Sequence, residues 1–304
     1  MQNSQCFAQR QALMFTSVGR VSARAPKNAS NRLVGRVGKR EVLLSQVKVF
    51  GKSIRVAVWP ADEKTIPLLL FNGIGASLEL LVPFADAMGN REIVTFDVPG
   101  TGESETTILP YRMWMLAMLA GGLLDQLGYG QVDALGVSWG GVVAQQFALQ
   151  NPRRCRKLIL AATSPGVLMV PPKLSVLTKF MTPKRFNDAN YRKEIAGEIY
   201  GGKARTNKSS VEEFRKASKR GYLYQQLTLI GWTSVPWLAF LRQPTLIMAG
   251  DDDPVIHLAN AKILTGLIRD SRLHVVADGH LFLISSAEDA AEEISNFLGS
   301  DRRD

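Results

Sequence analysis

The stretch Gly136-Val137-Ser138-Trp139-Gly140 carries the strongest structural signal in this chain of 304 residues. It follows a continuous apolar run at 132–135 and precedes residues 140–150, which are long enough for three helical turns. A serine between two close glycines on a strand-to-helix turn is typical of a nucleophile elbow. The turn strains the serine backbone, and side chains at the flanking glycines would collide with the strand or helix. We therefore predict that Ser138 is a nucleophile.

Similar short apolar runs recur along the chain, and this pattern is typical of strands buried on both faces. They lie at 68–71, 93–96, 132–135, 158–161 and 245–248. Helical patterns separate them, for example at 111–127 and 287–298, the latter with Ser286 as a candidate N-cap. Alternating residues at 46–50 and 53–58 predict a hairpin. The predicted class is α/β, with a mostly parallel central sheet and helices on both faces.

Residues 171–240 interrupt this alternation of strands and helices. They contain no buried-strand pattern, 13 Lys or Arg against 5 Asp or Glu, and ten of the 24 aromatic residues. We predict that 171–240 form a helical cap insertion, and that 46–170 and 241–300 form the core domain.

The charge is concentrated at the N-terminus. The net charge is +10, from 37 Lys and Arg against 27 Asp and Glu, and residues 1–40 hold eight basic residues and no acidic one. We predict that 1–45 are a basic leader, either disordered or not a real part of the protein, with the composition of an organellar transit peptide. No nucleic-acid module accompanies the charge, so no nucleic-acid partner is expected.

Composition excludes several classes of protein. The content of 46% hydrophobic and 21% charged residues is ordinary for a globular chain. Two cysteines exclude a disulfide scaffold or a cysteine-rich zinc module, and they favour a reducing, cytoplasmic compartment. The longest apolar run, 113–124, is too short to span a membrane. The sequence indicates no oligomeric state.

The chain has three histidines, so the general base can be sought by elimination. His274 lies in an alternating strand pattern and is expected to be structural, and His257 lies at a helix start, where a surface or capping role is expected. His280 lies in a loop after the last predicted strand. Such loops collect the sites of open α/β sheets, so His280 is the predicted base.

The acid should stand between nucleophile and base in the chain. Asp251, Asp252 and Asp253 follow the strand pattern that ends near residue 249, and any of them could accept the imidazole N–H. We favour Asp253, which leaves the other two as capping or solvated residues. Asp133 and Asp97 remain as alternatives.

A loop for the oxyanion is expected after an early strand. Residues 68–71 run into Asn72-Gly73-Ile74-Gly75-Ala76, where glycines allow close approach of the backbone. We predict that the Ile74 and Trp139 N–H groups form an oxyanion hole. The Walker lysine is absent, and the glycines at 100 and 102 lack the third glycine of a dinucleotide site, so no metal or cofactor is expected.

The order of glycine loop, serine turn, acid and histidine resembles the α/β-hydrolase superfamily. Over about 47–298 the chain looks most like the intracellular poly(3-hydroxyalkanoate) depolymerases that act on medium-chain-length polyester. The segments that carry this resemblance are Phe71-Asn72-Gly73-Ile74-Gly75-Ala76, Phe96-Asp97-Val98-Pro99-Gly100, Tyr129-Gly130-Gln131-Val132-Asp133, Gly136-Val137-Ser138-Trp139-Gly140-Gly141, Tyr200-Gly201-Gly202, Gly231-Trp232-Thr233-Ser234, Ala249-Gly250-Asp251-Asp252-Asp253-Pro254 and Asp278-Gly279-His280-Leu281-Phe282-Leu283-Ile284. The resemblance implies Ser138 as nucleophile, Asp253 as acid and His280 as base, although His257 stands where the family has Pro.

The predicted function is a serine ester hydrolase that cleaves polyester to hydroxy acids or oligomers through an acyl-enzyme. A lipase, thioesterase or hydroxyacyl transferase is the alternative, and a non-catalytic ligand-binding protein is a more distant one. Candidate substrate-binding residues are Asn72, Tyr200, Trp232 and Trp237, although the aromatic ones would equally suit the core of the insertion. The basic residues of 171–240 suggest a storage-granule surface as a partner.

Overall fold

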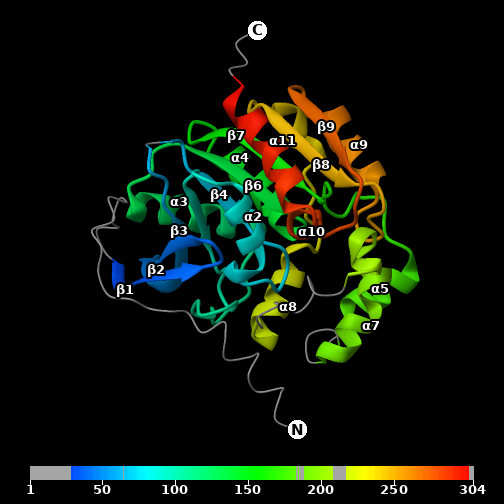
Figure 1. The fold of residues 1–304 in the computed structure, drawn as a ribbon, viewed down its shortest axis with the longest axis horizontal. Coiled ribbons are helices and arrows are strands. Elements are labelled where there is room, and N and C mark those ends of the chain that lie inside the picture. Colours follow the sequence, from blue (N-terminus) through cyan, green and yellow to red (C-terminus); the bar gives the residue numbers. More distant parts are fainter. Residues whose placement is uncertain (1–28, 64, 183, 185–187, 208–216, 301–304) are drawn as a thin grey trace.

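A computed structural model of the chain describes residues 29–63, 65–182, 184, 188–207 and 217–300. In this part of the chain, nine strands form one sheet in the order β1-β2-β3-β5-β4-β6-β7-β8-β9 (Figure 1). The strands are β1 (Ala29–Val37), β2 (Arg40–Val49), β3 (Lys52–Trp59), β4 (Leu68–Phe71), β5 (Ile93–Phe96), β6 (Val132–Val137), β7 (Cys155–Ala161), β8 (Thr245–Gly250) and β9 (Ser271–Val276).

The sheet is mostly parallel, as the sequence predicts. The pairs from β5 through β4, β6, β7 and β8 to β9 are parallel, and the pairs β1·β2, β2·β3 and β3·β5 are antiparallel. Strands β4, β5, β6 and β8 are buried along their whole length. Because neighbouring parallel strands run in one direction, the loops after β4, β6, β8 and β9 meet at one edge of the sheet.

Helices cover both faces, since each face of the sheet has its own apolar cluster. One cluster joins the sheet to α3 (Met113–Leu127), α4 (Trp139–Gln150) and α9 (Leu258–Leu267). The other joins it to η1 (Leu78–Leu81), α2 (Val82–Ala87), α10 (Phe282–Ser285) and α11 (Ala287–Gly299). Burial of these two clusters is the main favourable term for the fold.

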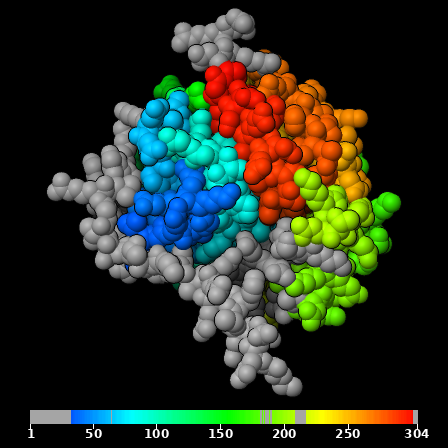
Figure 2. Space-filling view, in the orientation of Figure 1, coloured from blue at the N-terminus to red at the C-terminus, as the bar shows by residue number. Residues whose placement is uncertain are grey.

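The named elements that the structure describes between β7 and β8 are all helices, joined by turns and irregular segments, and we call residues 171–240 the cap segment. Its helices are α5 (Leu174–Met181), α7 (Ala189–Tyr200), η2 (Gly202–Arg205), α8 (Lys219–Thr228) and η4 (Val235–Phe240). In Figure 1, α5 and α7 lie side by side at the lower right, and α8 lies apart from them near the lower centre. Figure 2 shows the yellow-green part of this segment against the red and orange C-terminal part.

The predicted leader of residues 1–45 is wrong for residues 29–45, which form β1 and most of β2. The two strands pair antiparallel from Ala29↔Val47 to Val37↔Arg40. β1 is an edge strand, where basic side chains are common because they discourage further pairing, so its composition imitates that of a disordered tail. Arg40 even donates to three backbone carbonyls, those of Pro60, Ala85 and Arg91. The rest of the predicted leader, 1–28, lies outside the described residues.

Candidate active site

Ser138 sits on a sharp turn between β6 and α4, with backbone angles of φ 56° and ψ −121°. A non-glycine residue with positive φ stores strain, which persists only where its surroundings enforce it. Here a Cβ atom on Gly136 would lie 2.3 Å from the Gly140 oxygen, and one on Gly140 would lie 2.1 Å from the Phe71 oxygen. The glycines on either side of Ser138 are therefore required by close backbone contacts, as the sequence predicts.

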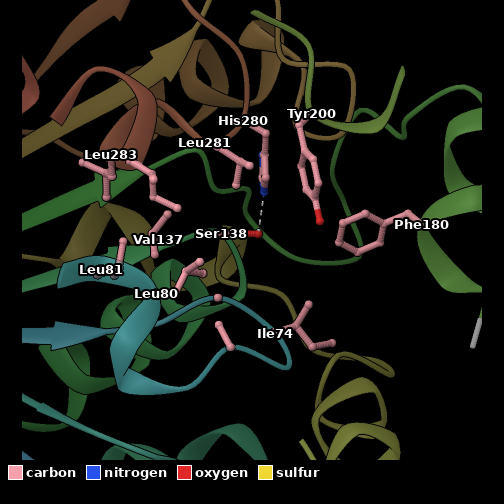
Figure 3. A pocket seen from close by; sticks show the side chains of 13 residues that line it. Ile74, Leu80, Leu81, Val137, Ser138, Phe180, Tyr200, His280, Leu281 and Leu283 are labelled. Carbon is pink, nitrogen blue, oxygen red and sulfur yellow. Dashed lines mark hydrogen bonds between the residues drawn. The ribbon is translucent and has the colours of Figure 1, made fainter. Parts of the chain in front are cut away.

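Ser138, His280 and Asp253 form a chain of hydrogen bonds, of which Figure 3 shows the one between His280 and Ser138. The His280 Nε2 atom is 3.0 Å from Ser138 Oγ, and the His280 Nδ1 atom is 2.7 Å from Asp253 Oδ2. Asp253 Oδ1 accepts the N–H groups of Val255 and Ile256, at 2.9 and 2.8 Å, which fixes the carboxylate. An Nδ1–H that donates to Asp253 leaves Nε2 with a lone pair for the Ser138 hydroxyl.

The sheet brings these three side chains together from distant parts of the sequence. Ser138 follows β6, Asp253 follows β8 and His280 follows β9, and all three strands point the same way. His280 and Asp253 are only 5% and 4% exposed, so the Asp253–His280 hydrogen bond is shielded from water and its polarising effect is strong.

The other two histidines lie elsewhere. The His274 side chain is on β9, with Nδ1 3.6 Å from Glu293 Oε2. His257 occupies the N-cap position of α9, but its side chain makes no capping hydrogen bond. Neither is near Ser138 in the sheet, which agrees with the roles predicted for them.

The alternative acids are engaged in other interactions. Asp252 pairs with Arg205 at 2.7 Å, and Asp133 pairs with Arg91 and with Arg156. Asp97 lies next to the Arg55 guanidinium on the far side of the oxyanion loop. Asp251 is exposed, and its N–H donates to the carbonyl of Val276.

The predicted oxyanion loop lies directly against the serine turn. A Cβ atom on Gly73 would be 3.8 Å from Ser138 Cβ. The next residues form a tight turn in which Ala76 N–H donates to the Gly73 carbonyl at 3.2 Å and Gly75 has a φ of 73°. Trp139 is the first residue of α4, so its N–H has no acceptor within the helix. Both predicted donors thus belong to loops that touch at Ser138.

A pocket opens over Ser138, and its walls are mainly apolar. It is lined by Gly73, Ile74, Ala76, Leu80, Leu81, Val137, Ser138, Phe180, Tyr200, His280, Leu281, Leu283 and Ile284. The Tyr200 ring stacks on His280 with 6.3 Å between ring centroids and an interplanar angle of 16°. Figure 3 shows Tyr200 and Phe180 on the cap side and the leucines on the other. The residues predicted to bind substrate include Tyr200 but not Phe180 or the leucines.

Three predicted substrate-binding residues do not line this pocket. The Trp232 and Trp237 rings pack edge to face at 5.9 Å, and Trp232 Nε1 donates to Gln146 at 2.8 Å. Both rings pack against the apolar cluster that joins the sheet to α3, α4 and α9, because a large aromatic surface gains most from burial. Asn72 is buried, and its side-chain amide donates to the Ser77 carbonyl at 2.7 Å. These residues hold the fold and the loop.

Sequence analysis also missed Asp278, a buried carboxylate next to the histidine loop. Its oxygens accept from the hydroxyls of Ser285 and Ser286 and from the N–H groups of Lys203 and Gly279, all at 2.7 to 2.8 Å. Burial alone would raise the pKa of Asp278, but these hydrogen bonds outweigh it and hold the pKa below its usual value. Ser286 does occupy the N-cap position of α11, but its side chain bonds Asp278 and makes no capping hydrogen bond.

Neither metal-type clusters nor membrane-spanning helices occur in the described part of the chain. Within those residues, no group of three or more His, Cys, Asp or Glu could hold a metal ion. Among the same residues, no helix has the length and hydropathy to cross a membrane.

Comparison with known proteins places this geometry in a family. The model of the alpha/beta hydrolase fold matches residues 66–287. The chain is 47% identical over 262 residues to a poly(3-hydroxyalkanoate) depolymerase from Ectopseudomonas oleovorans, covering 84% of this chain and 93% of that protein. A solved hydrolase from Pseudomonas aeruginosa PA01 is 25% identical, with a TM-score of 0.72, over 84% of this chain and 98% of that one.

A solved esterase from Exiguobacterium antarcticum shares the fold, with a TM-score of 0.73 at 20% identity over 84% of this chain and 99% of that one. The sheet order, the strained serine turn and the matched segment agree with one another. The chain therefore belongs to the alpha/beta hydrolase fold family, in the branch that includes the Ectopseudomonas poly(3-hydroxyalkanoate) depolymerase.

Proposed function

We propose that this protein is a serine ester hydrolase that cleaves poly(3-hydroxyalkanoate) to hydroxy acids or short oligomers. The observation that carries the proposal is the hydrogen-bonded chain of Ser138, His280 and Asp253 at the base of an apolar pocket. The 47% identity to the Ectopseudomonas depolymerase supports the choice of substrate.

In the proposed acylation, His280 Nε2 takes the proton of Ser138 as Oγ attacks the ester carbonyl carbon. The Asp253 carboxylate stabilises the imidazolium that forms and keeps the ring oriented. Collapse of the tetrahedral intermediate breaks the bond to the alcohol oxygen, and His280 delivers the proton to this leaving group. Ser138 then carries the acyl group as an ester.

Deacylation repeats these steps with water. His280 removes a proton from the water molecule, which attacks the acyl-enzyme, and Ser138 leaves with the proton returned by His280. In both stages the negative oxygen is held by the N–H groups of Ile74 and Trp139. Such donors act in a site largely closed to water, where each is worth a factor of about 100 to 1,000 in rate.

The walls of the pocket support an apolar hydroxyacyl group as substrate. Leu80, Leu81 and Leu283 line one side, and Phe180 and the Tyr200 ring line the other (Figure 3). An aliphatic side chain gains about 0.8 kcal/mol for each buried CH₂ group in such surroundings. Within the described residues, His280 is the one titratable group among the pocket walls besides Tyr200, so charged acyl groups would lack a partner.

We further propose that the protein works in the cytoplasm at the surface of polyester granules. Support comes from apolar side chains around the start of α5, where Val167, Leu168 and Leu174 are 53%, 57% and 74% exposed. The same helix carries Phe180 into the pocket. Lys173 is among the exposed neighbours, so charge and apolar area would act together at a coated granule.

Incubation of the purified protein with medium-chain polyester granules tests the proposal. Release of soluble hydroxy acids or oligomers from the granules is expected, and Ser138→Ala should abolish it while thermal unfolding stays unchanged. Ser295→Ala, a serine on α11 remote from the pocket, serves as the matched control. Turnover of acyl-thioesters or triglycerides without granule hydrolysis would contradict the polyester assignment, and activity of Ser138→Ala would contradict the serine mechanism.

A further inference from the structure

The inner face of α8 touches both loops that supply the oxyanion donors. Gln225, on this helix, is fully buried. A buried glutamine needs hydrogen-bond partners for both its amide oxygen and its amide nitrogen. Its Oε1 atom accepts the Gly75 N–H at 2.8 Å, and its Nε2 atom donates to Thr101 Oγ1 at 2.7 Å. Gly75 follows Ile74 directly, so this side chain reaches from the cap segment into the oxyanion loop.

The same residue also meets the second donor loop. The indole Nε1 of Trp139 donates to the Gln225 carbonyl oxygen at 3.2 Å and to Thr228 Oγ1 at 3.1 Å. The Thr228 hydroxyl in turn donates to the Gln225 carbonyl at 2.6 Å. The side chain of the residue that follows the nucleophile is therefore anchored on α8, next to the group that holds Gly75.

The bond to Gly75 has a specific mechanical consequence for the turn. Gly75 is the third residue of the Gly73–Ala76 turn, and its positive φ is the value that a type II turn requires. The peptide between Ile74 and Gly75 is the central peptide of that turn, which reverses its direction when a type II turn converts to type I. An acceptor fixed on the Gly75 N–H opposes this reversal and so fixes the backbone on one side of Ile74.

Helix α8 is itself held firmly, so Gln225 is a rigid acceptor. Ser218, at its N-cap, donates through both its N–H and its hydroxyl to the Gly100 carbonyl, at 3.0 and 3.1 Å. A Cβ atom on Gly221 would lie 2.2 Å from that same oxygen, so the two backbones are in direct contact. Thr101, which receives the Gln225 amide, is the next residue along and is also fully buried.

We propose that Gln225 is a positioning residue that holds both donors of the oxyanion hole in register with Ser138. The inference rests on the proposed function, because it assigns a role within that reaction. Gln225 touches neither the ester nor the reacting atoms. Its side chain acts on Ile74 through the Gly75 peptide, and its backbone carbonyl, which a substitution retains, accepts the Trp139 indole N–H. Loss of the side chain should weaken stabilisation of the tetrahedral intermediate more than binding of the ground-state ester.

Gln225→Met tests this role, since methionine has a similar length and offers the Gly75 N–H only a weak acceptor. With p-nitrophenyl octanoate as substrate, kcat should fall by about 10 to 100-fold, less than for direct loss of a donor, and KM should stay within about twofold. Tyr224→Phe is the matched control on the same helix. It removes the hydrogen bond from the Tyr224 hydroxyl to the Ile108 carbonyl, which is remote from the oxyanion loop, and should leave kcat within about twofold.

An alkyl trifluoromethyl ketone provides a readout that loss of general packing would not reproduce. Its serine adduct carries an oxyanion, so its affinity should fall in Gln225→Met by the same factor as kcat/KM, while KM for the ester stays within about twofold. Equal kcat in Gln225→Met and the wild type, or equal losses in Gln225→Met and Tyr224→Phe, would overturn the proposal.

Two further variants keep the test decisive. If Gln225→Met does not fold, Thr101→Val, which removes the partner of the Gln225 amide, should lower kcat by several-fold with the same selectivity for the trifluoromethyl ketone, and an unchanged kcat would overturn the inference. Ser138→Ala is measured on the same ester. Activity in that variant overturns the serine mechanism and this inference together, whereas an inactive Ser138→Ala beside an unaffected Gln225→Met overturns this inference alone.

Discussion

The two sides of the site are supported by buried carboxylates whose pKa values move in opposite directions. Asp278 stands beside the histidine loop and Asp97 beside the oxyanion loop, with exposed fractions of 2% and 1%. The pKa of Asp278 lies below its usual value, whereas that of Asp97 is raised to about 6 by burial, which the Arg55 charge opposes only in part. Two carboxylates with similarly small exposed fractions therefore have pKa values shifted in opposite directions.

The difference lies in the depth of burial, which is greater for Asp97, and in the hydrogen-bond donors. Asp278 accepts four hydrogen bonds of 2.7 to 2.8 Å. Asp97 accepts one short bond, from the Leu78 N–H at 2.8 Å, and its contacts with Arg55 and with the Glu103 N–H are each 3.4 Å. Arg55 is shared with Glu79, whose negative charge also raises the pKa of Asp97. The deeper burial of Asp97 and its fewer, longer hydrogen bonds together make it the carboxylate that is harder to ionise.

The largest effect is expected from breaking the support on the histidine side. A Cβ atom on Gly279 would lie 2.0 Å from the Tyr200 carbonyl oxygen, which also accepts the His280 N–H at 2.7 Å. Gly279→Ala should displace His280 and lower kcat/KM for a p-nitrophenyl ester by at least about 100-fold. Gly266→Ala, in α9, has nothing within 4 Å of the added methyl group and should leave activity unchanged. Comparable kinetics in the two variants would show that the histidine loop tolerates movement.

A smaller effect is expected from Asp278→Asn, which presents an amide to some of the four donors. It should lower the free energy of unfolding by about 2–4 kcal/mol at pH 7, measured by urea titration. Because the folded pKa lies below the unfolded value, this stabilisation is complete above pH ~4 and is lost as the pH falls through the folded pKa. The difference in free energy of unfolding between the wild type and Asp278→Asn should therefore become smaller as the pH falls.

Asp252→Asn is the control for that measurement, since Asp252 serves the neighbouring helix η2 through an exposed ion pair with Arg205. Asp252→Asn should lower the free energy of unfolding by less than about 1 kcal/mol. An equal loss of unfolding free energy in Asp278→Asn and Asp252→Asn would mean that burial of the Asp278 network adds nothing to stability.

The smallest net effect is expected from Asp97→Asn, and it should appear mainly as a change in pH dependence. The folded pKa of Asp97, about 6, lies above the unfolded value, so the wild type loses stability as the pH rises from about 4 to about 6. This loss is on the order of 2–3 kcal/mol, and stability is flat above that range. When the free energy of unfolding is measured across this pH range, Asp97→Asn should not show this loss of stability. If the free energy of unfolding has the same dependence on pH in Asp97→Asn as in the wild type, the pKa of Asp97 is not raised by the fold.

Much of the site could be predicted because its signals are local. Ser138 lies between glycines that the turn itself requires, and elimination among three histidines points to His280, which lies within hydrogen-bond distance of Ser138. Asp253 cannot be told apart from Asp251 and Asp252 by local signals, since all three are adjacent carboxylates. Only the fold shows which of these carboxylates points at the imidazole and which one meets Arg205.

The predictions that failed concern side chains whose roles depend on distant partners. Trp232 and Trp237 have the composition of an apolar binding surface, but they pack on each other and on the core. The start of the sheet at residue 29 was hidden because an edge strand needs few apolar residues. In both cases the residue type gives the chemistry of a side chain, but it does not show which residues that side chain contacts in the fold.

By itself, the sequence determined the class of fold and the chemistry of the nucleophile, because strand burial, helix periodicity and glycine turns depend on residues close together in the chain. The tertiary structure decided what supports that chemistry. The contacts Gln225 to Gly75, Lys203 to Asp278 and His280 to Ser138 join residues 150, 75 and 142 positions apart. Such contacts leave no periodic pattern, since they exist only after the sheet has brought its carboxyl ends together and the cap segment has closed over them.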